Sequence, residues 1–359
     1  MRPAKGLALS ERETPRAGRR NRPALAGAGL LALLTLIALA FGACGERAKE
    51  VVAYTSVDQV FSEPVFRAFE EASGIRVRAV FDTEETKSTG VLNRLIAEGP
   101  SPQADVFWSG DPVRPFLLVR RGLVEPYLSP EAAALPGSLR AADGTWTGIA
   151  ARARVFLVNR TLVKPEETPR RLRDLVDPRW KGRAAIANPL FGTTTMHVAA
   201  LVSAWGEEDA RQFLDGLKAN DVRIASSNGE VKRLVVAGEV AFGLTDTDDA
   251  NEAQKELAEV DVVYPDAEGP GTLFMPTAVV LMRGAPHPEA ARRLVDFLLS
   301  ADTERRMADS AAHIPLRPGV PAPPEVRRAA DVRAMEVDFD RVAAEMERMQ
   351  PWLRRWAGL

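Results

Sequence analysis

Hydrophobic and polar positions alternate along the chain in two distinct periods from residue 50 onward. Short runs rich in β-branched and aromatic residues, typical of strands, occupy 51–54, 75–81, 104–108, 154–159, 184–187, 222–224, 240–244 and 272–283. Segments of helical character, most with apolar residues every three or four positions, occupy 61–72, 86–98, 194–205, 208–220, 230–237 and 288–300. Strands that alternate with helices predict an α/β fold with a mainly parallel sheet covered by helices.

Polar loops follow the first three predicted strands, at Ser56–Asp58, Asp82–Thr86 and Ser109–Asp111. In open parallel sheets, ligands bind beyond the carboxyl ends of the strands. We therefore expect these loops to contribute to a binding site. Trp108 is the last residue of the third predicted strand, and we expect it to form a wall of that site.

The first 44 residues have a different character from the rest. Residues 1–22 hold seven basic and two acidic residues, a net charge of +5, and residues 24–40 are uncharged. This pattern is typical of a secretory signal, and the residues that end at Cys44 resemble the lipobox of bacterial lipoproteins. We expect a signal peptide at 1–43 and a lipidated Cys44 with a tether at 44–49. An uncleaved membrane anchor is the alternative, and it also places the remainder outside the cytoplasm.

Composition narrows the function of the exported part. The whole chain has a net charge of −2, so the part after the predicted cleavage site carries −7 and is not a typical nucleic-acid binder. A single cysteine excludes an internal disulfide framework and a cysteine-cluster zinc site. The three histidines lack metal-ligand spacing and are expected to be structural. No nucleophile elbow, His-Glu-x-x-His or phosphate-loop motif occurs, so we expect a binding protein rather than an enzyme.

Six segments, in their order and spacing, resemble the periplasmic solute-binding proteins of ABC importers. They are 54–58 (YTSVD), 66–75 (FRAFEEASGI), 93–98 with 102–108 (NRLIAE, PQADVFW), 177–182 (DPRWKG), 237–244 (AGEVAFGL) and 285–290 (APHPEA). The greatest similarity is to the ferric-ion-binding branch of the type II class. The resemblance implies a periplasmic, lipid-anchored monomer that delivers a small solute to an ABC permease in the inner membrane.

The type II fold implied by the resemblance has two α/β lobes, hinge strands and an interlobe cleft that closes on the ligand. The hinge strands are expected near 154–159 and 271–280. Lobe one would then consist of 50–153 plus 273–318, and lobe two of 154–272. A helical C-terminal extension would occupy 319–359.

The metal ligands of the family are altered in this sequence. The iron-binding relatives carry two adjacent tyrosines at the positions of Asp248 and Asp249, whereas the tyrosines of this chain are isolated, at 54, 127 and 264. The resemblance places further ligands at Asp58 and Asp111. Carboxylates suit hard cations such as iron(III), Mn²⁺ or Ca²⁺, and equally suit an organic cation such as a polyamine. Capping of the following helix by residues 246–249 is the structural alternative.

Two polar turns that open helices, at 192–195 (GTTT) and 226–229 (SSNG), are candidate anion sites. The resemblance places a co-bound anion at the first, although ordinary helix capping predicts the same residue types. Thr83 and Thr86 lie on a loop expected to face the cleft. The complete set of candidate ligand-binding residues is Asp58, Thr83, Thr86, Asp111, Gly192, Thr193, Thr194, Asn228, Asp246, Asp248 and Asp249.

The sequence therefore predicts a substrate-binding lipoprotein of an ABC importer. The first candidate ligand is a metal ion such as iron(III), with or without an anion, and no cofactor is required. The alternatives are a polyamine or other organic cation, and a phosphorylated solute. A sensory receptor for a membrane kinase and a secreted enzyme on the same scaffold are alternatives of other classes.

Overall fold

The computed structural model describes residues 49–82, 89–256 and 259–359. The predicted signal peptide, the lipidation site Cys44, most of the tether, and Thr83 and Thr86 lie outside the described residues. Among the residues that are described, none of the helices is long and apolar enough to cross a membrane.

The chain opens with two consecutive β-α-β units, as the hydrophobic pattern predicts. Their elements are β1 (Glu50–Thr55), α2 (Gln59–Ser73), β2 (Arg76–Phe81), α3 (Thr89–Glu98) and β3 (Val106–Ser109). Strand β1 pairs in parallel with both β2 and β3, so β1 is central and the ends of β1 and β3 lie side by side. Gly74 ends α2 in the left-handed conformation (φ 68°), which glycine adopts at little cost.

The remaining elements continue the α/β alternation. The strands are β4 (Val124–Glu125), β5 (Thr147–Asn159), β6 (Ala184–Ala187), β7 (Arg223–Ala225), β8 (Phe242–Asp246), β9 (Val260–Val263) and β10 (Phe274–Met282). The α-helices are α4 (Val113–Arg120), α5 (Gly192–Trp205), α6 (Glu207–Ala219), α7 (Asn228–Val236), α8 (Thr247–Lys255), α9 (Pro288–Leu298), α10 (Ala301–Ala311) and α11 (Phe339–Trp356). Short 3-10 helices are η1 (Pro130–Ala134), η2 (Gly137–Leu139), η3 (Pro165–Glu167), η4 (Leu172–Val176), η5 (Pro178–Trp180) and η6 (Ala329–Asp331).

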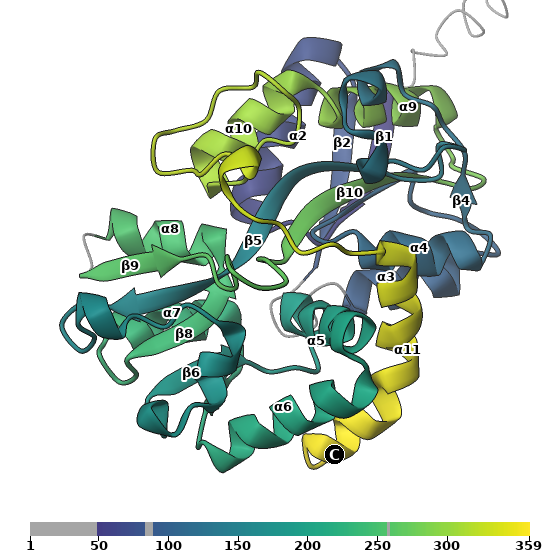
Figure 1. The fold of residues 1–359 in the computed structure, drawn as a ribbon. Coiled ribbons are helices and arrows are strands. Elements are labelled where there is room, and N and C mark those ends of the chain that lie inside the picture. Colours follow the sequence, from purple (N-terminus) through teal and green to yellow (C-terminus); the bar gives the residue numbers. More distant parts are fainter. Residues whose placement is uncertain (1–48, 83–88, 257–258) are drawn as a thin grey trace, which may run out of the picture. The chain divides into compact units, whose positions relative to one another are not determined.

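Strand β5 connects two groups of strands. The strand order is β2-β1-β3-β10-β5-β8-β6-β7, with β4 on β10 and β9 on β5. The first half of β5 pairs with β10, and its second half pairs with β8 and β9. Figure 1 shows β5 running from the group of β1, β2 and β10 to the group of β6, β8 and β9. The α/β fold expected from the sequence is confirmed.

Strand β5 is longer than its hydrophobic pattern predicts. It begins at Thr147, seven residues before the predicted start at Arg154. The additional residues include a glycine, three alanines and Arg152, which have little strand propensity of their own. Every residue of the strand is nevertheless buried, because neighbouring strands and helices cover both faces. Tertiary packing, rather than local preference, therefore determines the start of β5.

Trp108 belongs to the hydrophobic core and does not form a wall of the binding site. Its side chain is fully buried, and its ring N–H donates to the Thr277 hydroxyl over 3.1 Å. The ring packs edge-on against Phe66 of α2, with 5.8 Å between centroids. The expectation that Trp108 lines the cleft is therefore wrong.

The C-terminal helix α11 packs against both α4 and α5. Figure 1 shows its first turns beside α4 and its length running past α5 towards the end of α6. Its apolar positions, including Val342, Met346, Met349 and Leu353, are buried. The apolar face of this helix, within the predicted helical C-terminal extension, is thus part of the core.

Candidate functional site

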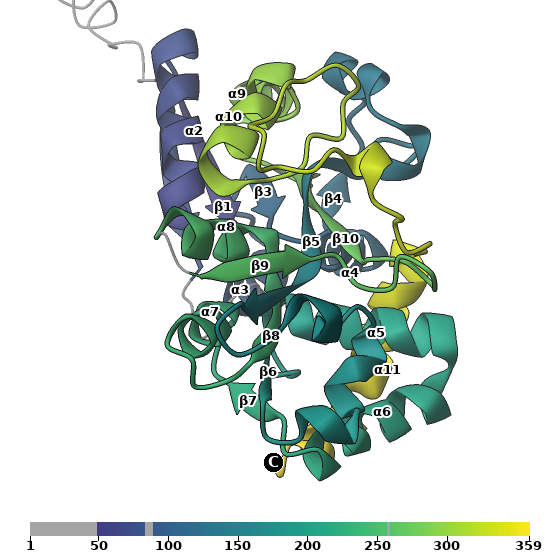
Figure 2. The same cartoon turned by 60° about the vertical axis from the view of Figure 1, so that its left-hand side comes forward.

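A cavity of about 390 Å³ lies where the first turns of four helices converge. It is lined from one side by Asp58 and the following residues at the start of α2. From the other side it is lined by the starts of α5, α7 and α8 and by Arg152 of β5. Figure 2 shows α2 above α8 and α7 along one side of the molecule. Because helix starts present unsatisfied N–H groups and a partial positive charge, the cavity can accept an anionic group.

The two polar turns predicted to bind an anion both line this cavity. Gly192, Thr193 and Thr194 open α5, and Asn228 opens α7. Gly192 has a φ of 58°, so the turn into α5 favours glycine for its backbone conformation. The Ser227 hydroxyl caps α7 by accepting from the Glu230 N–H over 3.1 Å. The turns are therefore well-formed helix starts that face the same space.

Asp246 lies at the wall of the cavity and is the centre of a buried polar network. Its Oδ1 accepts from Arg154 Nη1 over 2.6 Å, and its Oδ2 accepts from the Thr193 hydroxyl over 2.9 Å. Oδ2 also accepts from Asn228 Nδ2 over 3.2 Å and from Arg152 Nη1 over 3.1 Å. Burial would raise the pKa of Asp246, but the two guanidinium groups and these hydrogen bonds lower it below its usual value. Both carboxylate oxygens are thus engaged by the protein.

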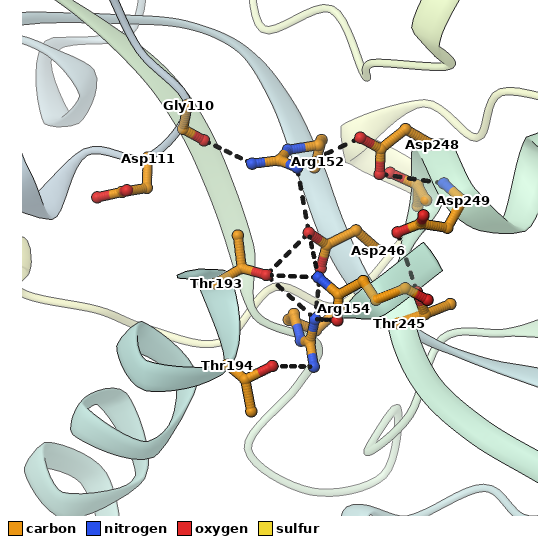
Figure 3. A network of polar contacts seen from close by, with 12 residues as sticks. Gly110, Asp111, Arg152, Arg154, Thr193, Thr194, Thr245, Asp246, Asp248 and Asp249 are labelled. Carbon is orange, nitrogen blue, oxygen red and sulfur yellow. Dashed lines mark hydrogen bonds and ion pairs between the residues drawn. The ribbon is translucent and has the colours of Figure 1, made fainter. Parts of the chain in front are cut away.

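Arg154 holds the starts of α5 and α7 around Asp246. The side chain is fully buried, and it donates to the hydroxyls of Thr193 and Thr194 over 3.2 and 3.3 Å. It also donates to Asn228 Oδ1 over 3.0 Å. Figure 3 shows this arginine between Asp246 and the two threonines. Through these hydrogen bonds, the side chains of the two threonines hold the first turn of α5 in place.

Arg152 connects the acidic cluster to the loop after β3. Its Nη1 donates to Asp246 Oδ2 and, over 3.2 Å, to Asp248 Oδ2. Its Nη2 donates to the carbonyl oxygen of Gly110 over 2.7 Å. Sequence reasoning missed both arginines of β5. The available signal was their spacing, because charged residues two apart in an otherwise apolar strand lie on one face and require buried partners.

Three carboxylates come together at the start of α8. Asp246, Asp248 and Asp249 each offer an oxygen, and these oxygens lie within 4.8 Å of one another. Asp249 Oδ2 accepts from the Thr245 hydroxyl over 3.0 Å. Asp58 lines the same cavity, together with Glu252. Five acidic residues therefore line the cavity, against the two arginines of β5, and the site is negative overall.

Asp111, predicted as a metal ligand, does not line this cavity. It is almost fully buried, and its Oδ1 accepts from the backbone N–H groups of Val113 and Arg114 at the start of α4. Its Oδ2 pairs with Arg114 Nη1 over 2.5 Å. The preceding residue, Gly110, contacts the site instead, because its carbonyl oxygen accepts a hydrogen bond from Arg152. Figure 3 shows Asp111 apart from the cluster.

The structure thus brings together most of the described candidate residues. Around one cavity lie Asp58, Gly192, Thr193, Thr194, Asn228, Asp246, Asp248 and Asp249. The arrangement offers carboxylate oxygens for a positive centre and helix N-termini for a negative group, separated by the two arginines of β5. Such an arrangement is chemically suited to a small solute that carries charges of both signs.

The chain belongs to the family of bacterial extracellular solute-binding proteins, whose sequence profile matches residues 101–343. It is 30% identical over 304 residues to "Iron uptake protein A1" of Synechocystis, covering 82% of this chain and 83% of that protein. It is 28% identical over 339 residues to a "Putative 2-aminoethylphosphonate-binding periplasmic protein" of Salmonella typhimurium, covering 91% and 92%. Iron-bound HitA from Pseudomonas aeruginosa has the same fold, with a TM-score of 0.77 at 24% identity over 85% of this chain and 99% of HitA. These comparisons confirm the predicted family and its two-lobed periplasmic fold.

Proposed function

We propose that this protein is the substrate-binding lipoprotein of an ABC importer. It would capture a small solute, close on it, and deliver it unchanged to a permease in the inner membrane, with Cys44 as the lipid anchor. One observation carries the proposal: a single cavity combines an acidic cluster with the N-termini of α5 and α7. No catalytic step and no cofactor are part of this function.

The proposed lobes are 50–153 plus 273–318 and 154–272. Strand β5 supports this division, because its first half pairs with β10 of the first group and its second half pairs with β8 and β9 of the second. The cavity receives α2 from the first lobe and α5, α7 and α8 from the second. A hinge motion across β5 and β10 would therefore narrow the cavity around its ligand.

The first candidate ligand is a hard metal ion, such as iron(III), bound together with an anion. Asp248, Asp249 and Asp58 would supply oxygen ligands, which hard cations prefer. Asp246 would stay a support, because both of its oxygens already accept hydrogen bonds from the protein. The anion would bind at the starts of α5 and α7 and complete the coordination of the metal. The name of the iron uptake relative supports this candidate.

The second candidate ligand is an organic zwitterion with an ammonium and a phosphonate or phosphate group. The same division of charge favours it: the ammonium would face Asp58, Asp248 and Asp249, and the phosphonate would face the helix starts. The name of the Salmonella relative supports this candidate, because 2-aminoethylphosphonate is such a zwitterion. This candidate combines the organic-cation and phosphorylated-solute alternatives in one molecule.

Native mass spectrometry with elemental analysis of the purified protein would identify the ligand class. Isothermal titration with ferric citrate, Mn²⁺, spermidine and 2-aminoethylphosphonate then gives affinities. The double variant Asp248→Asn with Asp249→Asn should weaken binding of the identified ligand by about tenfold to a hundredfold, because hydrogen bonds or coordination to charged groups are lost. Asp215→Asn, on the exposed face of α6, is the matched control. Unchanged affinity in the double variant would refute the assigned site.

A further inference from the structure

We infer that Arg152 is an internal competitor for the positively charged centre of the ligand. The Arg152 guanidinium donates to the carboxylates of Asp246 and Asp248, the latter being one of the proposed ligand contacts. A ligand cation can therefore bind Asp248 only by replacing a charge that the protein already supplies. The inference rests on the proposed function, since it concerns the ligand of the same cavity.

The position of Arg152 is that of a group at the edge of the site rather than behind it. Its side chain is 9% exposed and lines the main cavity. It also lines a small adjacent cavity of about 10 Å³ that Asp58 and Asp248 border from the other side. Both of its Nη atoms donate to protein acceptors, and among the described residues its buried Nε has no hydrogen-bond partner, as is also true of Arg154.

Arg154, two residues further along β5, shows what a purely supporting arginine looks like here. It is fully buried, it does not line either cavity within the described residues, and its hydrogen bonds go to Asp246, Thr193, Thr194 and Asn228. Asp246 therefore remains paired through Arg154 if Arg152 moves away. The same displacement would remove the hydrogen bond from Arg152 to Asp248 Oδ2, while Arg152 keeps its bond to the Gly110 carbonyl.

The charge of Arg152 is permanent in this environment. Burial acts to lower its pKa, but Asp248 and Asp246, followed by Asp58 and Asp249, raise the pKa above the usual value for arginine. A change in pH within the physiological range would not remove the competitor. Only a ligand that interacts more strongly with the carboxylates, or that also binds at the helix starts, would displace it.

Arg152 would therefore set the charge selectivity of the cavity. It would weaken the binding of a lone small cation, which makes favourable contacts only with the carboxylates. It would weaken the binding of a metal–anion pair or a zwitterion less, because these ligands also make contacts with the N-termini of α5 and α7. The cavity would select its ligand in two ways: by competition from Arg152 against a lone cation, and by attraction to a ligand that carries both charges.

The test measures Mn²⁺ affinity by isothermal titration in the unsubstituted protein, Arg152→Lys and Arg152→Gln. Removal of the competing charge should raise Mn²⁺ affinity by about tenfold or more in Arg152→Gln. The Mn²⁺ affinity of Arg152→Lys should lie between those of the unsubstituted protein and Arg152→Gln. One ammonium group cannot bind the Gly110 carbonyl and both carboxylates at once. Arg114→Gln is the matched control, since Arg114 is equally buried and paired, to Asp111. Equal or lower Mn²⁺ affinity in both Arg152 variants would overturn the inference.

A second measurement does not depend on metal binding. In Arg152→Ala, methylguanidinium should refill the position beside Asp246 and Asp248 and raise the melting temperature, with no such rise in the unsubstituted protein or in Arg114→Gln. If no variant binds any metal but methylguanidinium still stabilises Arg152→Ala, the metal candidate fails and the role of Arg152 stands. If methylguanidinium has no effect on Arg152→Ala, the inferred competition is wrong.

Discussion

At the scale of single residues, the pair of Asp246 and Arg154 organises the site. Both side chains are fully buried, and their charge-assisted hydrogen bond spans 2.6 Å. Removal of one partner from a buried ion pair is strongly destabilising, because the other charge is left without compensation. The starts of α5 and α7 depend on the same pair through Thr193 and Asn228.

Asp246→Leu should therefore lower the free energy of unfolding by about 3–5 kcal/mol. The reason is that Arg154 would keep only neutral partners, the hydroxyls of Thr193 and Thr194 and the amide of Asn228. Urea unfolding followed by circular dichroism gives the value. The double variant Asp246→Leu with Arg154→Met should recover most of the loss, and a single-variant loss below about 1 kcal/mol would contradict the assigned role.

Two buried histidines predict how stability depends on pH. Burial, followed by the nearby Arg154, lowers the pKa of His197 from 6.5 to about 3. Burial and Arg152 lower the pKa of His313 in the same way, also to about 3. The unfolded chain binds these protons more readily, so the stabilisation is complete above pH 6.5 and is lost as the pH falls towards 3.

The free energy of unfolding should fall by about 1.4 kcal/mol per pH unit for each of these histidines below pH 6.5. Urea unfolding at pH 7.0, 6.0 and 5.5 stays above the range in which ordinary carboxylates titrate. His197→Gln should reduce the slope by about half. A slope that is identical in the variant and the unsubstituted protein would show that His197 does not remain neutral in the folded state.

The residues that line the cavity could be predicted where they belong to a recognisable motif or follow the end of a strand. The turns at 192–195 and 226–229 and the residues Asp58, Asp248 and Asp249 all reach the cavity. Asp111 does not, because its carboxylate caps α4 and binds Arg114, a partner three residues away that the loop pattern does not reveal. Arg152 was missed because its partners come from residues 110, 246 and 248, which only the folded sheet brings together.

At the scale of elements, local pattern predicted most helices and strands but not the contacts of β5 and α11. The β-α-β units from β1 to β3 follow directly from short apolar runs and helical spacing. The first half of β5 is defined by its pairing with β10, which is more than a hundred residues away in the sequence. Helix α11 was predicted as amphipathic, but its apolar face alone does not identify α4 and α5 as the surfaces it covers.

Helix α11 should contribute strongly to stability through its apolar face. Leu353 is fully buried in the cluster that includes residues of α5, so Leu353→Ala should lower the free energy of unfolding by about 2–5 kcal/mol. Arg354→Ala, exposed on the same turn, should change it by less than about 0.5 kcal/mol. Chemical unfolding of the two variants distinguishes the packed face from the exposed one. Equal effects would mean that α11 is not docked as described.

At the scale of the whole described protein, one of three clusters of buried apolar side chains spans the two groups of strands. A single cluster of buried side chains includes Phe107 and Val124 from the first group, Phe156 and Phe242 from the second, and Trp352 of α11. Strand β5 passes through both groups, and the chain returns to the first group through β10. Neither group can therefore lose its structure without exposing apolar surface of the other.

We accordingly expect cooperative unfolding of the proposed lobes as one unit. Calorimetry should show a single transition, with a calorimetric enthalpy close to the van't Hoff enthalpy. Saturating ligand should move that whole transition upwards, by a free energy that grows with the logarithm of ligand concentration, because a ligand in the cavity would contact helices from both proposed lobes. Two resolved transitions, with only one of them shifted by ligand, would show that the lobes are energetically separate and that β5 acts as a linker between them. Gly148→Pro, near the start of β5, is expected to lower the single transition temperature as a whole, because proline is unfavourable inside a paired strand and both lobes use this strand.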